Sequence, residues 1–193
     1  MPLFSPYNAP HPGYIAGRWI QPICYSDLGA GTALSSTNMR LLPFYVPARL
    51  RIDRIGLRIT TLAAAGNVRC GIYRHDATLG VPTGAPLCDS GSLSTASAGL
   101  VAATVDTTME PGWYWQAVLA DNTTVVLQTI LSTYPLIAQF CGTMTDTISN
   151  DAATTSRAAA QYTATYGALP TIDPALVNFG TTQGTGLIRM RAA

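Results

Sequence analysis

The stretch of this sequence that most constrains its fold runs from Val46 to Arg74. Apolar residues recur there at every second position, and they are Ile55, Leu57, Ile59, Val68, Cys70 and Ile72. A period of two is typical of strands with one buried face and one exposed face. Between the two runs, Gly66 and Asn67 favour a turn. The stretch therefore predicts a β-hairpin whose apolar face builds the core.

The opposite phase of this predicted hairpin carries Arg54, Arg58 and Arg69. Three arginines on one face predict a small basic stripe. A solvated or edge-protecting face is one interpretation of the stripe. Contact with another subunit or with an anionic glycan is the other.

Charged residues make up only 11% of the 193 residues, against about 25% in ordinary globular domains. Apolar residues make up 48%, which argues against disorder and favours a surface covered by other subunits. A net charge of +1 gives no general reason to expect nucleic-acid binding. No window approaches the ~18 apolar residues of a membrane span, so we expect no membrane insertion. We also expect synthesis in a cytoplasm, since the N-terminus does not resemble a secretory signal.

Residues 1–20 contain four prolines, with the aromatic residues Phe4, Tyr7 and Tyr14 among them. Proline at this density excludes a helix and disfavours a central strand. An extended N-terminal arm is expected, and its aromatic side chains are candidate contacts. The arm packs either on its own domain or on a neighbouring subunit.

Residues 21–193 are expected to form a single domain. Residues 75–92 are rich in Gly, Pro and Asp and predict mostly turns. A second hairpin is predicted from Trp113 to Leu131, turning at Asp121 and Asn122. Residues 141–185 predict a long loop of small and hydroxylated residues, with a possible short helix over 151–161. Tyr162 and Tyr166 in this loop are candidate partner or glycan contacts.

The chain thus reads as eight to ten short strands separated by turns. This pattern predicts an all-β fold, an antiparallel β-sandwich of the jelly-roll type, with the arm and the long loop as additions.

Catalytic patterns are scarce. The two histidines, His11 and His75, lie far apart in the sequence, and no nucleophile elbow, dinucleotide-binding motif or phosphate-binding loop occurs. The four cysteines are widely spaced, which does not indicate a metal site and leaves open whether any of them pair. We therefore expect no catalytic residue, no cofactor and no metal, and a protein that is not an enzyme. The side chains of Trp113 and Trp115 face one side of a strand, so either they stack on sugars or they enter the core.

Four segments, IDRIGLRITT, GNVRCGIYR, GVPTGAPLCDSGSL and MEPGWYWQAVLA, resemble a pattern in structural proteins of tailed bacteriophages. Those proteins are jelly-roll modules of fibres, spikes, baseplates or head decorations, and they are commonly trimeric. The resemblance covers residues 46–120 and implies a virion subunit that contacts copies of itself and other virion proteins. It implies a fibre or spike subunit that acts in assembly and host attachment, with surface polysaccharide as a candidate ligand. Capsid decoration and carbohydrate binding are the alternatives.

Overall fold

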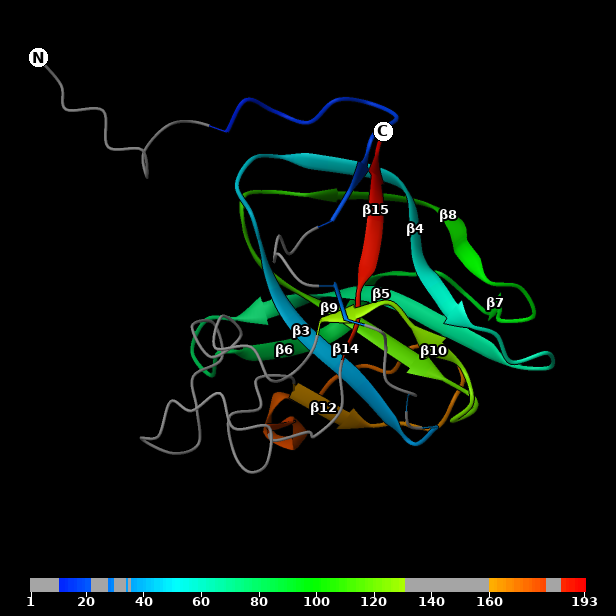
Figure 1. Ribbon diagram of the computed structural model, residues 1–193. Coiled ribbons are helices and arrows are strands. Elements are labelled where there is room, and N and C mark those ends of the chain that lie inside the picture. Colours follow the sequence, from blue (N-terminus) through cyan, green and yellow to red (C-terminus); the bar gives the residue numbers. More distant parts are fainter. Residues whose placement is uncertain (1–10, 22–27, 30–33, 35, 131–159, 180–184) are drawn as a thin grey trace, which may run out of the picture.

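The computed structural model describes residues 11–21, 28–29, 34, 36–130, 160–179 and 185–193 (Figure 1). Every pairing between its strands is antiparallel, and two large sheets pack face to face, so the predicted all-β sandwich is confirmed. The five-stranded sheet contains β1 (Trp19–Ile20), β4 (Leu50–Thr61), β8 (Gly99–Met109), β10 (Val126–Leu127) and β15 (Ile188–Ala192).

The seven-stranded sheet contains β3 (Asn38–Val46), β5 (Asn67–Asp76), β6 (Val81–Asp89), β7 (Leu93–Ser94), β9 (Gly112–Ala120), β12 (Ala160–Thr163) and β13 (Asn178–Phe179). A small third sheet joins β2 (Leu28–Gly29), β11 (Thr129–Ile130) and β14 (Thr185–Gly186). The one helical element of the described chain is a 3₁₀ turn, η1 (Pro174–Leu176).

The predicted hairpin from Val46 to Arg74 is wrong. β4 belongs to the five-stranded sheet and β5 to the seven-stranded sheet, so the connection between them crosses from one sheet to the other. Its loop is held by Thr95, whose backbone carbonyl accepts from Ala63 N and whose N–H donates to Gly66 O. Alternation specifies which face of a strand is buried, but strands from opposite sheets bury their faces against each other equally well.

The predicted hairpin from Trp113 to Leu131 is wrong for the same reason, because β9 lies in the seven-stranded sheet and β10 pairs with β4. Residues 75–92 are also more ordered than the predicted turns. They contain β6, which forms a true hairpin with β5. Asp76 makes its turn, accepting from Thr78 N and Leu79 N, and Gly80 adopts a positive φ of 70°.

The core between the sheets contains the inward side chains that the alternation predicts. All six of these residues on β4 and β5 are at most 1% exposed. One buried polar side chain joins the two sheets within this core. Gln116 on β9 donates from Nε2 to Gly186 O at 2.9 Å, and its Oε1 accepts from Ile188 N at 3.2 Å. It therefore satisfies backbone groups where β14 ends and β15 begins.

The outer face of the seven-stranded sheet is also buried, which differs from the exposed face that alternation predicts. Tyr73 on β5 is 0% exposed and Trp115 on β9 is 2% exposed. Both belong to a second apolar cluster with Leu169 and Ile172. Because β12 pairs with β3 and Ile172 pairs with Gly84 on β6, residues 164–172 cross this face from one edge to the other. We call residues 164–172 the strap.

The strap and strands β12 and β13 replace part of the predicted long loop. The predicted helix does not reach residue 161, because residues 160 and 161 lie in β12, and 151–159 lie outside the described residues. The described part of the arm packs on its own domain. Gly17 N donates to Ala192 O, and Tyr14 packs on the inter-sheet core. Phe4 and Tyr7 lie outside the described residues.

We predict that Gln116→Leu lowers the free energy of unfolding by about 2–4 kcal/mol, because it leaves a buried carbonyl and a buried N–H without partners. Urea unfolding followed by circular dichroism measures this loss. Gln128→Leu is the matched control, since the Gln128 side chain is half-buried and accepts one bond from Arg189. Equal stability of the two variants would contradict a linking role for Gln116.

Candidate binding surfaces

The outer face of the five-stranded sheet gathers half of the described arginines. We call it the arginine face, and its arginines are Arg51, Arg54, Arg58, Arg189 and Arg191. They share this face because the alternate residues of β4 and β15 point into the core. The register places Arg191 directly beside Arg54, and Arg189 beside Gly56.

Two carboxylates on this face are already paired. Asp53 accepts two bonds from Arg191, and Asp106 accepts two from Arg51 at 2.9 and 3.0 Å. The hydrogen bonds from Arg191 lower the pKa of Asp53, and those from Arg51 lower the pKa of Asp106. Both acids are therefore ionised and engaged at neutral pH.

Arg54 and Arg58 make no salt bridge with any described carboxylate, and Arg189 bonds to the neutral amide of Gln128 at 3.0 Å. Arg69, which the sequence places in one stripe with Arg54 and Arg58, does not lie on this face. It is on β5, in the other sheet. The predicted stripe is therefore wrong for Arg69. Arg191 of β15 lies beside Arg54 instead.

Arg69 helps to hold the strap. Its Nη1 donates to Asp89 Oδ2 at 2.9 Å, and the same oxygen accepts from Leu169 N at 3.0 Å. The other oxygen of Asp89 accepts from Gly91 N at 2.8 Å. The side chains of Arg69 and Asp89 are only 18% and 23% exposed, so this ion pair is shielded from solvent.

Tyr162 and Tyr166, the candidate contacts of the late loop, are half-buried and pack on the cluster beneath the strap. The Tyr166 hydroxyl bonds to the Ser92 hydroxyl at 2.8 Å. Tyr73 donates to Pro170 O at 2.8 Å from below. Gly71 lies under Leu169, and a Cβ there would come within 2.4 Å of Cys88 O. The tyrosines of this region therefore help to attach the strap.

Exposed aromatic residues gather at one end of the seven-stranded sheet. Tyr45 on β3 faces Trp113 on β9, with ring centroids 5.3 Å apart, and the two are 49% and 39% exposed. Trp115 lies in the next row, with Phe179 6.5 Å from it. We call Tyr45 and Trp113 the aromatic end. The two tryptophans therefore differ: Trp113 is partly exposed, whereas Trp115 is buried in the cluster beneath the strap.

A hollow of about 210 Å³ joins the aromatic end to the described part of the arm. Tyr45 lines it together with His11, Tyr14, Pro47 and other residues. The rings of His11 and Tyr14 are 4.5 Å apart, and burial raises the pKa of Tyr14. Tyr14 is therefore a contact within its own domain, beside the exposed ring of Tyr45.

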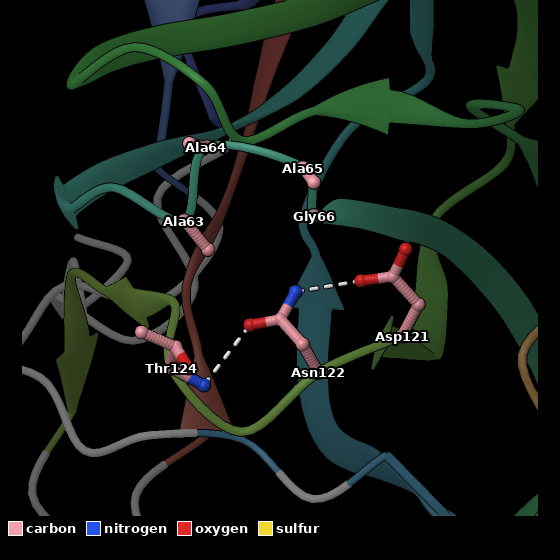
Figure 2. Close-up of a pocket in the computed structure, with 7 residues that line it drawn as sticks. All are labelled: Ala63, Ala64, Ala65, Gly66, Asp121, Asn122 and Thr124. Carbon is pink, nitrogen blue, oxygen red and sulfur yellow. Dashed lines mark hydrogen bonds between the residues drawn. The ribbon is translucent and has the colours of Figure 1, made fainter.

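A larger hollow, about 400 Å³, lies between the β4–β5 connection and the loop after β9 (Figure 2). Figure 2 shows Ala63 and Ala64 across from Asn122 and Thr124. Asn122 Oδ1 accepts from Thr124 N at 3.0 Å, and Asn122 Nδ2 donates to Asp121. These polar groups already form hydrogen bonds within the loop after β9. We therefore assign no ligand to the hollow.

Cys70 is buried and Cys88 half-buried, and both are free thiols. Burial raises the pKa of Cys70 to about 12 and that of Cys88 to about 11, so neither is a reactive thiolate at neutral pH. Cys24 and Cys141 lie outside the described residues. Within the described ranges, no three His, Cys, Asp or Glu side chains group as metal ligands would, and no helix is long and apolar enough to cross a membrane.

Comparison with known proteins adds no assignment. No protein-family model matches this chain, and no curated protein matches it. The sequence signal that would have located the arginine face is the alternation of Arg189 and Arg191 with Ile188, Met190 and Ala192 in the last strand. That signal does not say which strand lies beside β15.

His75 predicts a dependence of stability on pH. Its Nδ1 accepts from Trp115 Nε1 at 2.9 Å, and burial lowers the pKa of His75, with Asp76 opposing. Below about pH 6.5 the unfolded chain therefore binds a proton that the folded chain does not. Stability is full above that pH and falls as the pH drops toward the folded pKa.

We expect His75→Gln, which keeps an acceptor near Trp115, to reduce the loss of stability between pH 7.5 and 5.5. Urea midpoints at the two pH values measure the effect. An unchanged difference between those midpoints would show that another group carries the dependence.

Asp89→Asn should loosen the strap, because it removes the negative charge that strengthens the hydrogen bond from Arg69. We expect a loss of about 1–3 kcal/mol and faster amide hydrogen exchange at Leu169. Asp76→Asn is the control, since Asp76 caps an exposed turn. Exchange at Leu169 that matches the wild type would contradict the role of Asp89.

Proposed function

We propose that this chain is a non-enzymatic structural subunit of a bacteriophage virion, a homo-oligomer, expected to be a trimer, in a surface fibre or spike. It acts in assembly with other virion proteins and in attachment to the host. Capsid decoration is the alternative location. The resemblance of residues 46–120 to phage structural proteins motivates the virion assignment.

The arrangement of the strands supports this proposal. We infer that the sandwich is a jelly roll, since β1, β15, β4 and β8 face β3, β9, β5 and β6. Eight strands in two sheets are the jelly-roll number. The connections β3–β4, β4–β5, β8–β9 and β9–β10 all cross between the sheets. Jelly rolls are frequent among viral coat proteins, although fold alone does not determine function.

The aromatic end is the observation that carries the oligomer proposal. Tyr45 and Trp113 form a tilted ring pair that is partly open to solvent, and the described arm passes beside them. Aromatic side chains of this kind are enriched among residues that dominate protein–protein binding energy. The strap already covers the rest of this sheet face, so association through this end needs no rearrangement of the fold.

We predict that the purified chain forms an oligomer, and that Tyr45→Ser and Trp113→Ser each weaken its association by about 30-fold or more. Light scattering coupled to size exclusion, over a concentration series, measures this. Leu62→Ser is the matched control, because Leu62 is 47% exposed and lies at the opposite end of the sandwich. A chain that stays monomeric at high concentration would overturn the oligomer proposal.

The virion assignment has its own test. Mass spectrometry of gradient-purified virions, from the phage whose genome encodes the chain, should detect it in a fixed ratio to the major coat protein. Its absence from such particles, while it is present in the lysate of infected cells, would overturn the assignment. Side-chain imaging of the particle then distinguishes a spike from a capsid decoration.

A further inference from the structure

We propose that the arginine face binds an anionic polysaccharide, with Arg54, Arg58 and Arg189 as cationic contacts and Trp19 as a stacking surface for a sugar ring. This inference deepens the attachment role and rests on the proposed function for its biological meaning. The binding site itself does not depend on the oligomeric state.

The arginine face has a local excess of positive charge. Five arginines share the face with Asp53 and Asp106, and each of those acids is occupied by a two-bond pair with one arginine. Three guanidinium groups remain without a salt bridge to a described carboxylate, although Arg54 lies close enough to Asp53 to help lower its pKa. The whole chain has a net charge of only +1, so this surplus is local. A planar guanidinium matches carboxylate and sulfate groups with two parallel hydrogen bonds.

The centre of the arginine face carries only small residues. Gly56 and Ala102 are direct neighbours in the middle of the face, where they leave little side-chain height. A Cβ on Gly56 would come within 2.3 Å of Val101 O, so a larger residue does not fit. Arg54 and Arg58 flank this low centre about 13 Å apart along β4, at the usual rise per residue. Arg189 borders it from β15. The result is a flat, closely packed floor, in which Gly56 is itself buried and Ala102 half-buried, with cations at its edges.

Trp19 adds an aromatic ring to the arginine face. It pairs with Arg191 across β1 and β15, so it shares the outer face with the arginines, while its neighbour Ile20 packs on the core. The Trp19 side chain is 38% exposed. An exposed indole offers a flat apolar surface to the apolar face of a sugar. The combination favours an acidic polysaccharide over an acidic peptide. Three unpaired arginines are few for nucleic acid, whose binding depends on many phosphate contacts.

Binding of the full-length chain to alginate, a carboxylated polysaccharide, tests the proposal by biolayer interferometry at low salt. Polyglutamate and single-stranded DNA at equal charge are the comparison probes, and neutral dextran is the uncharged one. We expect alginate to bind most tightly of the four, and its binding to weaken as salt is raised.

The double variant Arg54→Gln/Arg58→Gln should weaken alginate binding by about tenfold, whereas Arg49→Gln/Arg74→Gln, which removes two arginines elsewhere, should change it less than twofold. Trp19→Leu should weaken binding of alginate but not of polyglutamate. Circular dichroism and the oligomeric state of each variant verify that the fold is retained.

Equal binding of all polyanions, unaffected by Trp19→Leu, would overturn the polysaccharide assignment, and tightest binding of DNA would replace it with a nucleic-acid site. Loss of alginate binding in both double variants alike would overturn the location. These outcomes are separate from the proposed function, since a chain that forms oligomers and occurs in virions but does not bind alginate would fail only here.

Discussion

The structure depends on one constraint, that most successive long strands lie in opposite sheets, the β5–β6 hairpin being the exception. Hydrogen-bond partners are therefore distant in the sequence, as for β4, which pairs with β8 on one side and with β15 on the other. Among the described residues, no local pairing joins the two large sheets, and the apolar residues between the sheets must hold them together. The amide of Gln116 adds a directional link inside that core, from β9 to the backbone at Gly186 and Ile188. A buried polar link of this kind favours one relative position of the two sheets.

The seven-stranded sheet is buried on both faces, and this has a consequence for function. The strap covers the outer side of β3, β9 and β5, and the ion pair of Arg69 with Asp89 holds it there. The strap therefore prevents a ligand from reaching that face except at the aromatic end. The five-stranded sheet has no described covering, and its outer face carries the unpaired arginines.

The two candidate surfaces therefore differ in chemistry and in place. The aromatic end offers apolar rings beside the described part of the arm, which suits association with another copy. The arginine face offers cations around a flat floor, which suits an extended anionic ligand. Because the surfaces lie on different sheets, a subunit can use the first for assembly and still present the second outward. This division connects the assembly and attachment parts of the proposed function.

The sequence by itself determined the fold class and the inward faces of β4 and β5, because a period of two depends only on local backbone geometry. It also indicated that Arg54 and Arg58 would point outward. Tertiary structure decided which strands pair. It placed β4 and β5 in different sheets, moved Arg69 to the opposite face and brought Arg189 beside Gly56. Alternation shows which side chains of a strand are buried, but it does not show which strand or segment covers them. The strand pairing, the strap and both binding surfaces therefore depend on contacts between segments that are distant in the sequence.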